Sequence, residues 1–125
     1  MGYYLCSASW FSCPPGSGAC ALCYPNQMET AWPNVQGHPP NYARCFDCVD
    51  LLPCGAVLQI YSQCQPQNII SVCVADHGSG AACSPSPPVA RLVDLTPAAF
   101  LALGRPLSDG LAKVLAYVGS GTCDW

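Results

Sequence analysis

The pattern of apolar and polar positions predicts five short strands joined by turn-rich loops. Alternation with a period of two is typical of a half-buried strand, and it appears in segments 3–11 and 111–118. Segments 55–61 and 68–75 are short apolar runs between glycine and polar residues, and the second is apolar on both faces, which predicts a central strand. A very short fifth strand is predicted at 91–93.

One short helix is predicted after the fifth strand. Thr96 is a favoured residue at a helix N-cap, and Pro97 is favoured at the first helical position. The following residues, 98–103, supply about two turns, and Gly104 suits the end of a helix. Short strands with little helix predict an all-β domain, and we expect a closed barrel because closure removes exposed strand edges.

Proline and glycine interrupt two long segments. Segment 20–48 has few strand signals and many breakers, so we expect irregular structure held in place by cysteines. Segment 78–88 is a loop of low complexity.

Length and charge restrict the classes of partner. A chain of 125 residues is predicted to form a single domain, 1–125. Only 9% of residues are charged, the formal net charge is -3, and the four cations do not cluster. Nucleic acids and anionic membranes need a basic face, and no apolar run is long enough to span a bilayer. We therefore expect a monomer with neither nucleic acid nor membrane as partner, and no cofactor.

Cysteine is unusually abundant. Eleven cysteines in 125 residues predict a disulfide framework and an oxidising, extracellular location, so we expect a secreted protein. Because eleven is odd, at least one thiol is free or pairs outside the chain.

Two C-x-x-C pairs offer an alternative to disulfides. Cys20/Cys23 and Cys45/Cys48 have nearly the spacing of a four-cysteine zinc ribbon. The many other cysteines favour disulfides for these four as well, so we expect no metal.

Two carboxylates are the first candidates for chemistry. Asp76 and Asp94 each end a short apolar strand in a chain that carries few charges. Both also have structural explanations, because Asp94 could cap the helix that follows and Asp76 could brace a turn.

Candidates from other residue types are weaker. His77 follows Asp76 and could form a proton-transfer pair with it, but adjacent strand side chains point to opposite faces, which favours an exposed loop histidine. Trp10 and Tyr61 could offer flat faces to sugar rings, although aromatic residues more often anchor a core or a loop.

Several motifs resemble one family. They are V-C-V-A-D-H-G at 72–78, L-V-D-L-T-P-A-A-F-L-A-L-G at 92–104, L-S-D-G-L-A-K-V at 107–114, S-A-S-W-F at 7–11 and L-P-C-G-A-V-L-Q-I at 52–60. In this order they resemble the double-psi β-barrel of expansins, fungal loosenins and the rare lipoprotein A family. The resemblance implies a six-stranded, disulfide-rich double-psi β-barrel.

The resemblance also implies roles for particular residues. Asp94 falls at the acid that expansins need for wall loosening and that family-45 endoglucanases use as general acid. Asp76 matches the acid at the end of the preceding long strand. Ser7 and Ser9 match groove-lining hydroxyl residues, and Trp10 matches an aromatic residue of the groove.

Two departures weaken a catalytic interpretation. Leu92 stands where expansins carry a histidine, and Val49 lies near the position of a histidine in the lytic transglycosylases of the rare lipoprotein A type. An inverting glycosidase also needs a second carboxylate at a suitable distance, for which Asp76 is the candidate.

We therefore expect a wall polysaccharide-binding protein that acts without hydrolysis through an open groove centred on Asp94. Cellulose, glucan or peptidoglycan is the expected partner, with Ser7, Ser9, Trp10, His77 and Tyr61 as contacts. One alternative is a glycoside hydrolase or lytic transglycosylase with Asp94 as general acid and Asp76 as second carboxylate. Another is a barwin-like defence protein or protease inhibitor that acts through loop 12–20 or 78–90.

Overall fold

The computed structural model describes residues 3–33, 52–78 and 91–123, with side chains from residue 7 in the first range and from residue 93 in the last. Its elements are β1 (Tyr3–Trp10), β2 (Glu29–Pro33), β3 (Ala56–Ser62), β4 (Ile69–Gly78), β5 (Arg91–Leu95), α2 (Pro97–Ala102), the 3-10 helix η3 (Leu107–Asp109) and β6 (Ala112–Thr122). The prediction of an all-β chain with a small helical part is confirmed.

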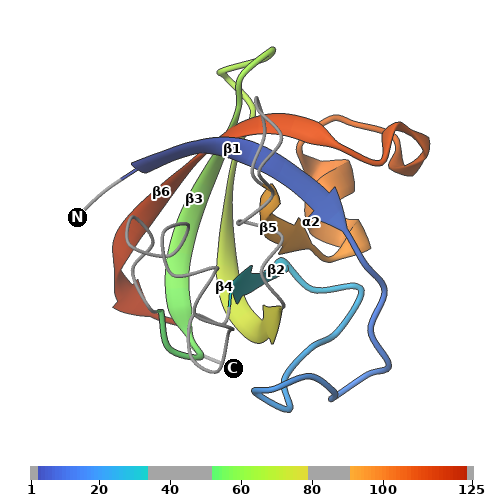
Figure 1. The fold of residues 1–125 in the computed structure, drawn as a ribbon, viewed down its shortest axis with the longest axis vertical. Coiled ribbons are helices and arrows are strands. Elements are labelled where there is room, and N and C mark those ends of the chain that lie inside the picture. Colours follow the sequence, from blue (N-terminus) through green and yellow to red (C-terminus); the bar gives the residue numbers. More distant parts are fainter. Residues whose placement is uncertain (1–2, 34–51, 79–90, 124–125) are drawn as a thin grey trace, which may run out of the picture.

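The strands form a closed barrel in the order β1-β5-β2-β4-β3-β6 (Figure 1). β1 pairs with β5 and β2 pairs with β4 in parallel, whereas the other four pairings are antiparallel. The predicted six-stranded barrel is therefore confirmed, with a mixed sheet that leaves no unpaired strand edge among the described strands.

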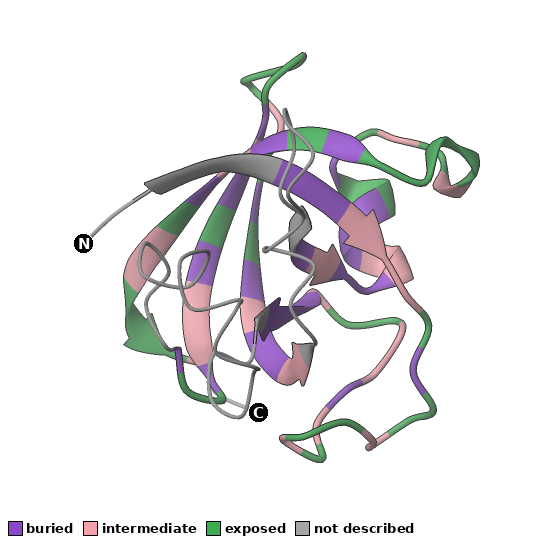
Figure 2. Cartoon of the chain, viewed as in Figure 1, coloured by how far each residue is buried: buried purple, intermediate pink, exposed green. Residues whose placement is uncertain are grey.

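The core fills the inside of the barrel. Alternate residues of β6 point inward, so Ala112, Val114 and Ala116 are buried between exposed or half-buried neighbours, and Figure 2 shows this alternation along the strands. Trp32 and Phe100 are the largest fully buried side chains. Phe100 comes from α2, which packs against β1, β4 and β5 and adds its apolar face to the same core.

Three strands are longer than the sequence predicts, and β6 extends to Thr122. β4 continues to Gly78 and β5 to Leu95, so Asp76, His77 and Asp94 lie within strands rather than after them. The prediction that β4 is a central strand is confirmed, because it pairs with β2 and with β3, although Ile69 at its start is 50% exposed.

The expectation of irregular structure across 20–48 is wrong for β2. Its five residues follow a loop with proline and end on Pro33, which leaves too little sequence for a periodic signal. β2 exists because it pairs on both sides, with β4 and with β5. Trp32, from this strand, is fully buried and so is a core residue.

Thr96 occupies the predicted N-cap position of α2, but its side chain makes no capping hydrogen bond. Its hydroxyl donates instead to the carbonyl oxygens of Gln27 and Glu29, beside the start of β2. The start of the helix is therefore tied to β2.

Three disulfides confirm the predicted framework: Cys13–Cys23, Cys20–Cys54 and Cys73–Cys123. Cys20 and Cys23 belong to different disulfides, so they do not act as a zinc-ligating pair. Cys45 and Cys48 lie outside the described residues. Among the cysteines whose side chains are described, Cys64 alone carries a free thiol. No helix in the described ranges is long and apolar enough to cross a membrane.

Two adjacent residues of α2 test this packing. Phe100→Ala should lower the free energy of unfolding by about 3–5 kcal/mol, because it leaves a cavity in the core. Leu101 is 52% exposed, so Leu101→Ala should change it by less than about 1 kcal/mol. Urea unfolding of both variants measures the difference, and equal losses would contradict the assigned orientation of the helix.

Candidate functional site

Three of the predicted site residues, Ser9, Asp94 and Asp76, lie in one row across four neighbouring strands. Ser9 of β1 pairs with Asp94 of β5, Asp94 pairs with Ala31 of β2, and Ala31 pairs with Asp76 of β4. Residues paired in register lie side by side on a sheet. We call these four residues the register row.

Asp94 points away from the core. Its neighbours in β5, Val93 and Leu95, are buried, and Asp94 itself is half-buried on the opposite face. The Ser9 hydroxyl donates a hydrogen bond of 2.8 Å to Asp94 Oδ1. The hydroxyl therefore fixes the orientation of this carboxylate.

Asp76 has a different environment, because its Oδ1 accepts two backbone hydrogen bonds. Ala19 N donates at 2.6 Å and His77 N donates at 2.8 Å. Gly18 packs against the same carboxylate, where a Cβ would come within 2.7 Å of Asp76 Cγ. Asp76 therefore anchors the loop between β1 and β2 to β4.

The two carboxylates are separated by one strand. Asp94 and Asp76 both pair with Ala31, so their Cα atoms are two strand spacings apart, roughly 10 Å. The carboxyl groups of inverting glycosidases are about 6.5–9.5 Å apart. Spacing alone thus allows Asp94 and Asp76 to form a catalytic carboxylate pair, but the two backbone hydrogen bonds give Asp76 a structural role.

Trp10 is the last residue of β1 and directly follows Ser9 of the register row. Its indole Nε1 donates to the Leu107 carbonyl oxygen at 2.8 Å, and its ring packs partly against the core. Trp10 pairs with Leu95, next to the Ser9–Asp94 pair. The ring is held in place one residue along β1 from Ser9, with part of its surface exposed.

Three other predicted contacts are less closely associated with Asp94. Ser7 is 3% exposed and precedes the shift in register of β1. His77 is half-buried within β4, and its Nε2 is 2.8 Å from the Leu52 carbonyl oxygen. Tyr61 pairs with Ile69, seven residues along β4 from Asp76, or roughly 20 Å away along the strand.

Thr30 is a site residue that the sequence reasoning missed. It is fully buried in β2, and its hydroxyl hydrogen-bonds to the carbonyl oxygens of Ala31 and Asp94. Thr30 thereby supports the backbone on which Asp94 stands. In the sequence, the only sign that Thr30 lies in a strand is its alternation with Trp32, and this pattern is too short to distinguish a strand from a loop.

No protein-family model matches the sequence, and no curated protein matches it either. Among solved structures, the Streptomyces papain inhibitor superposes with a TM-score of 0.59 at 23% identity, covering 94% of this chain and 93% of the inhibitor. The expansin of Clavibacter michiganensis superposes with a TM-score of 0.63 at 20% identity. The chain shares their fold.

The comparison with expansin covers 98% of this chain but only 53% of the expansin, so the chain spans about half of that protein. A mutant of the same expansin in complex with cellohexaose superposes with a TM-score of 0.61 at 19% identity, with the same coverage. The expansin-like barrel that the motifs predicted is therefore confirmed as the fold.

The contact between the loop and Asp76 is tested by two glycines with positive φ. Gly110→Ala should lower the free energy of unfolding by about 1–2 kcal/mol, because its φ of 71° is strained for alanine. Nothing lies within 4 Å of the added Cβ, so this loss reports the backbone strain alone. Gly18→Ala, at φ 86°, should cost about 1–3 kcal/mol more because its Cβ would overlap the Asp76 carboxylate. Chemical denaturation measures both, and equal losses would show that Asp76 does not pack closely on the loop.

Proposed function

We propose that the chain binds a cell-wall polysaccharide along the register row, centred on Asp94, without hydrolysing it. The observation that carries the proposal is the Ser9–Asp94 hydrogen bond, which presents an oriented carboxylate on the outer face of β5. The structure of an expansin mutant in complex with cellohexaose, on the same fold, supports a polysaccharide as ligand.

The chemistry of the row suits a sugar chain. A carboxylate has about four lone-pair positions, so Asp94 can accept hydrogen bonds from sugar hydroxyls in addition to that from Ser9. The Trp10 ring, held by the Leu107 carbonyl, offers an apolar face to the C–H groups of a sugar ring. A few fixed polar groups together with an aromatic ring are typical of specific ligand sites.

Binding without hydrolysis is favoured over a glycosidase mechanism by the state of Asp76. A second catalytic carboxylate must activate water or attack the sugar. Asp76 Oδ1 is instead used by Ala19 N and His77 N to hold a loop. Leu92, in the position of the expansin histidine, cannot transfer a proton.

The three disulfides support a secreted protein, because such bonds persist in oxidising compartments. The dispersed cations support a partner that is neither nucleic acid nor an anionic membrane.

Asp94→Asn tests the proposed site. The substitution removes the charge that strengthens hydrogen bonds from sugar hydroxyls, so affinity should fall about tenfold. Sedimentation of the protein with insoluble cellulose, β-glucan and peptidoglycan measures the bound fraction. Asp109→Asn is the matched control, since Asp109 lies on η3 and forms an ion pair with Arg105, and it should bind like the parent protein.

A reducing-end assay on the same suspensions separates binding from hydrolysis. We expect no product from the parent protein. Product that disappears in Asp94→Asn would replace the proposal with a hydrolase, and absence of binding to all three polysaccharides would refute it.

Inhibition of a papain-like protease is the second candidate. The specific observation is the match with the Streptomyces papain inhibitor, which covers nearly the whole length of both chains. The loop between β1 and β2 has the properties of an inhibitory segment. It is exposed or half-buried apart from Cys13 and Cys23, which close it as a disulfide, and it is joined internally by the antiparallel bridge Ser17–Cys23. A loop so fixed loses little entropy on binding.

Two exposed prolines test this second candidate. Pro15 lies in the β1–β2 loop, and Pro66 lies in the β3–β4 turn at the other end of the barrel (Figure 1). If the loop inhibits papain, Pro15→Asp should weaken inhibition at least tenfold, whereas Pro66→Asp should leave it unchanged. Full papain activity at micromolar parent protein would eliminate this candidate.

A further inference from the structure

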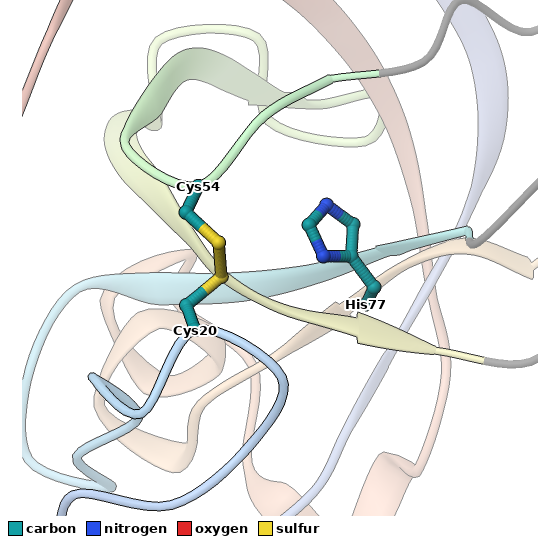
Figure 3. Close-up of side chains that lie close together, drawn as sticks. All are labelled: Cys20, Cys54 and His77. Carbon is teal, nitrogen blue, oxygen red and sulfur yellow. A yellow bond between two sulfur atoms is a disulfide. The ribbon is translucent and has the colours of Figure 1, made fainter.

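The ring of His77 lies beside the disulfide Cys20–Cys54 (Figure 3). One ligand atom from each of the three residues falls within 4.8 Å of the others. Cys20 comes from the β1–β2 loop, Cys54 from the turn before β3, and His77 from β4. Three segments distant in sequence thus bring two sulfur atoms and an imidazole together.

The imidazole is oriented as in many metal sites. Its Nε2 is 2.8 Å from the Leu52 carbonyl oxygen, which can only accept, so Nε2 carries the proton. In the neutral ring Nδ1 then has the lone pair, and Figure 3 shows a ring nitrogen on the side of the sulfur atoms. A backbone carbonyl on the other ring nitrogen is the usual support of a metal-ligating histidine.

We propose that Cys20, Cys54 and His77 form a redox-gated site for a thiophilic divalent cation such as Zn²⁺, closed by the disulfide and opened by its reduction. Two thiolates, one imidazole and a water molecule are a tetrahedral donor set that Zn²⁺ accepts. The site differs from a four-cysteine ribbon and is independent of the proposed polysaccharide binding.

The ligands are held in place by contacts that do not depend on the disulfide. Next to Cys20, Ala19 N donates to Asp76 Oδ1 at 2.6 Å. Next to Cys54, Gly55 N donates to the Val74 carbonyl at 2.8 Å. His77 is part of β4 itself. Cleavage of the S–S bond therefore leaves all three side chains anchored close together.

Among the described disulfides, Cys20–Cys54 is the one most accessible to a reductant in solution. Cys54 is exposed, whereas Cys13 and Cys23 are buried and the Cys73–Cys123 pair is half-buried. A small dithiol attacks one sulfur, the S–S bond breaks, and the dithiol leaves as its own disulfide after transfer of two electrons and two protons. Binding of Zn²⁺ by the two thiols then releases those two protons.

The rearrangement is small. Zn–S bonds of about 2.3 Å in a tetrahedron place two sulfur atoms roughly 3.8 Å apart. The three ligand atoms already lie within 4.8 Å of one another, so small side-chain rotations suffice.

Limited reduction and a cobalt titration test the proposal on the full chain. After reduction by a limiting dithiol, alkylation and peptide mass analysis should find Cys20 and Cys54 labelled before the cysteines of the other two described disulfides. Anaerobic Co²⁺ should then give a thiolate-to-metal absorption band that Zn²⁺ displaces, whereas the unreduced protein should give none.

Variants assign the ligands. His77→Ala and His77→Gln should each lower cobalt affinity by about 100-fold or more, since loss of even a supporting group costs 10–100-fold. Joint Cys20→Ser and Cys54→Ser should abolish the band. Cys64→Ser, which removes an exposed free thiol, is the control and should not change it.

Several results would overturn the proposal. One is alkylation of another disulfide before Cys20–Cys54, and a second is a thiolate-to-cobalt absorption band in the unreduced protein. A third is loss of the near-ultraviolet circular dichroism of the folded protein when this single disulfide is reduced. X-ray absorption of the cobalt-loaded parent protein decides the case if the histidine variants do not fold. Two sulfur ligands with one imidazole are expected, and a sulfur-only or oxygen-only shell contradicts the assignment.

Discussion

The barrel depends on the insertion of β2 between β4 and β5. This strand has only five residues, and it pairs in parallel with β4 on one side and antiparallel with β5 on the other. Without it, both neighbours would leave backbone hydrogen-bonding groups unpaired. Two reciprocal bonds hold its start, because Thr96 N donates to the Glu29 carbonyl and Glu29 N donates to the Thr96 hydroxyl. The same strand supplies Ala31, which places Asp94 and Asp76 at one level.

Most of the strands could be predicted because their signal is local. β1 and β6 alternate between apolar and polar positions, and β3 is a short apolar run between turns, so the chain itself carries the pattern. β2 could not be predicted, since its pairing on both sides comes from residues more than 40 positions away. The helix start at Pro97 was predicted, but the use of the Thr96 hydroxyl depended on that unforeseen strand.

The sequence could identify residues of the candidate site, but it could not identify the role of each one. Sequence motifs selected Asp94 and Ser9, and the register of β1 and β5 brings these two together. The motifs could not distinguish Asp94 from Asp76, because the difference lies in the Ala19 backbone N–H that occupies Asp76. The distance of Tyr61 from Asp94 could not be predicted either, because it depends on strand order, and β3 is separated from β5 by β4 and β2.

The disulfide Cys73–Cys123 has a mechanical consequence. It links the middle of β4 to the residue that follows β6, two strands away in the barrel order. A pulling force applied to the chain after Cys123 would pass through the disulfide to β4, instead of separating β6 from β1 and β3 one hydrogen bond at a time. β4 lies between β2 and β3, so the load would have to shear whole ladders at once. The barrel is thus covalently protected against unzipping from that side.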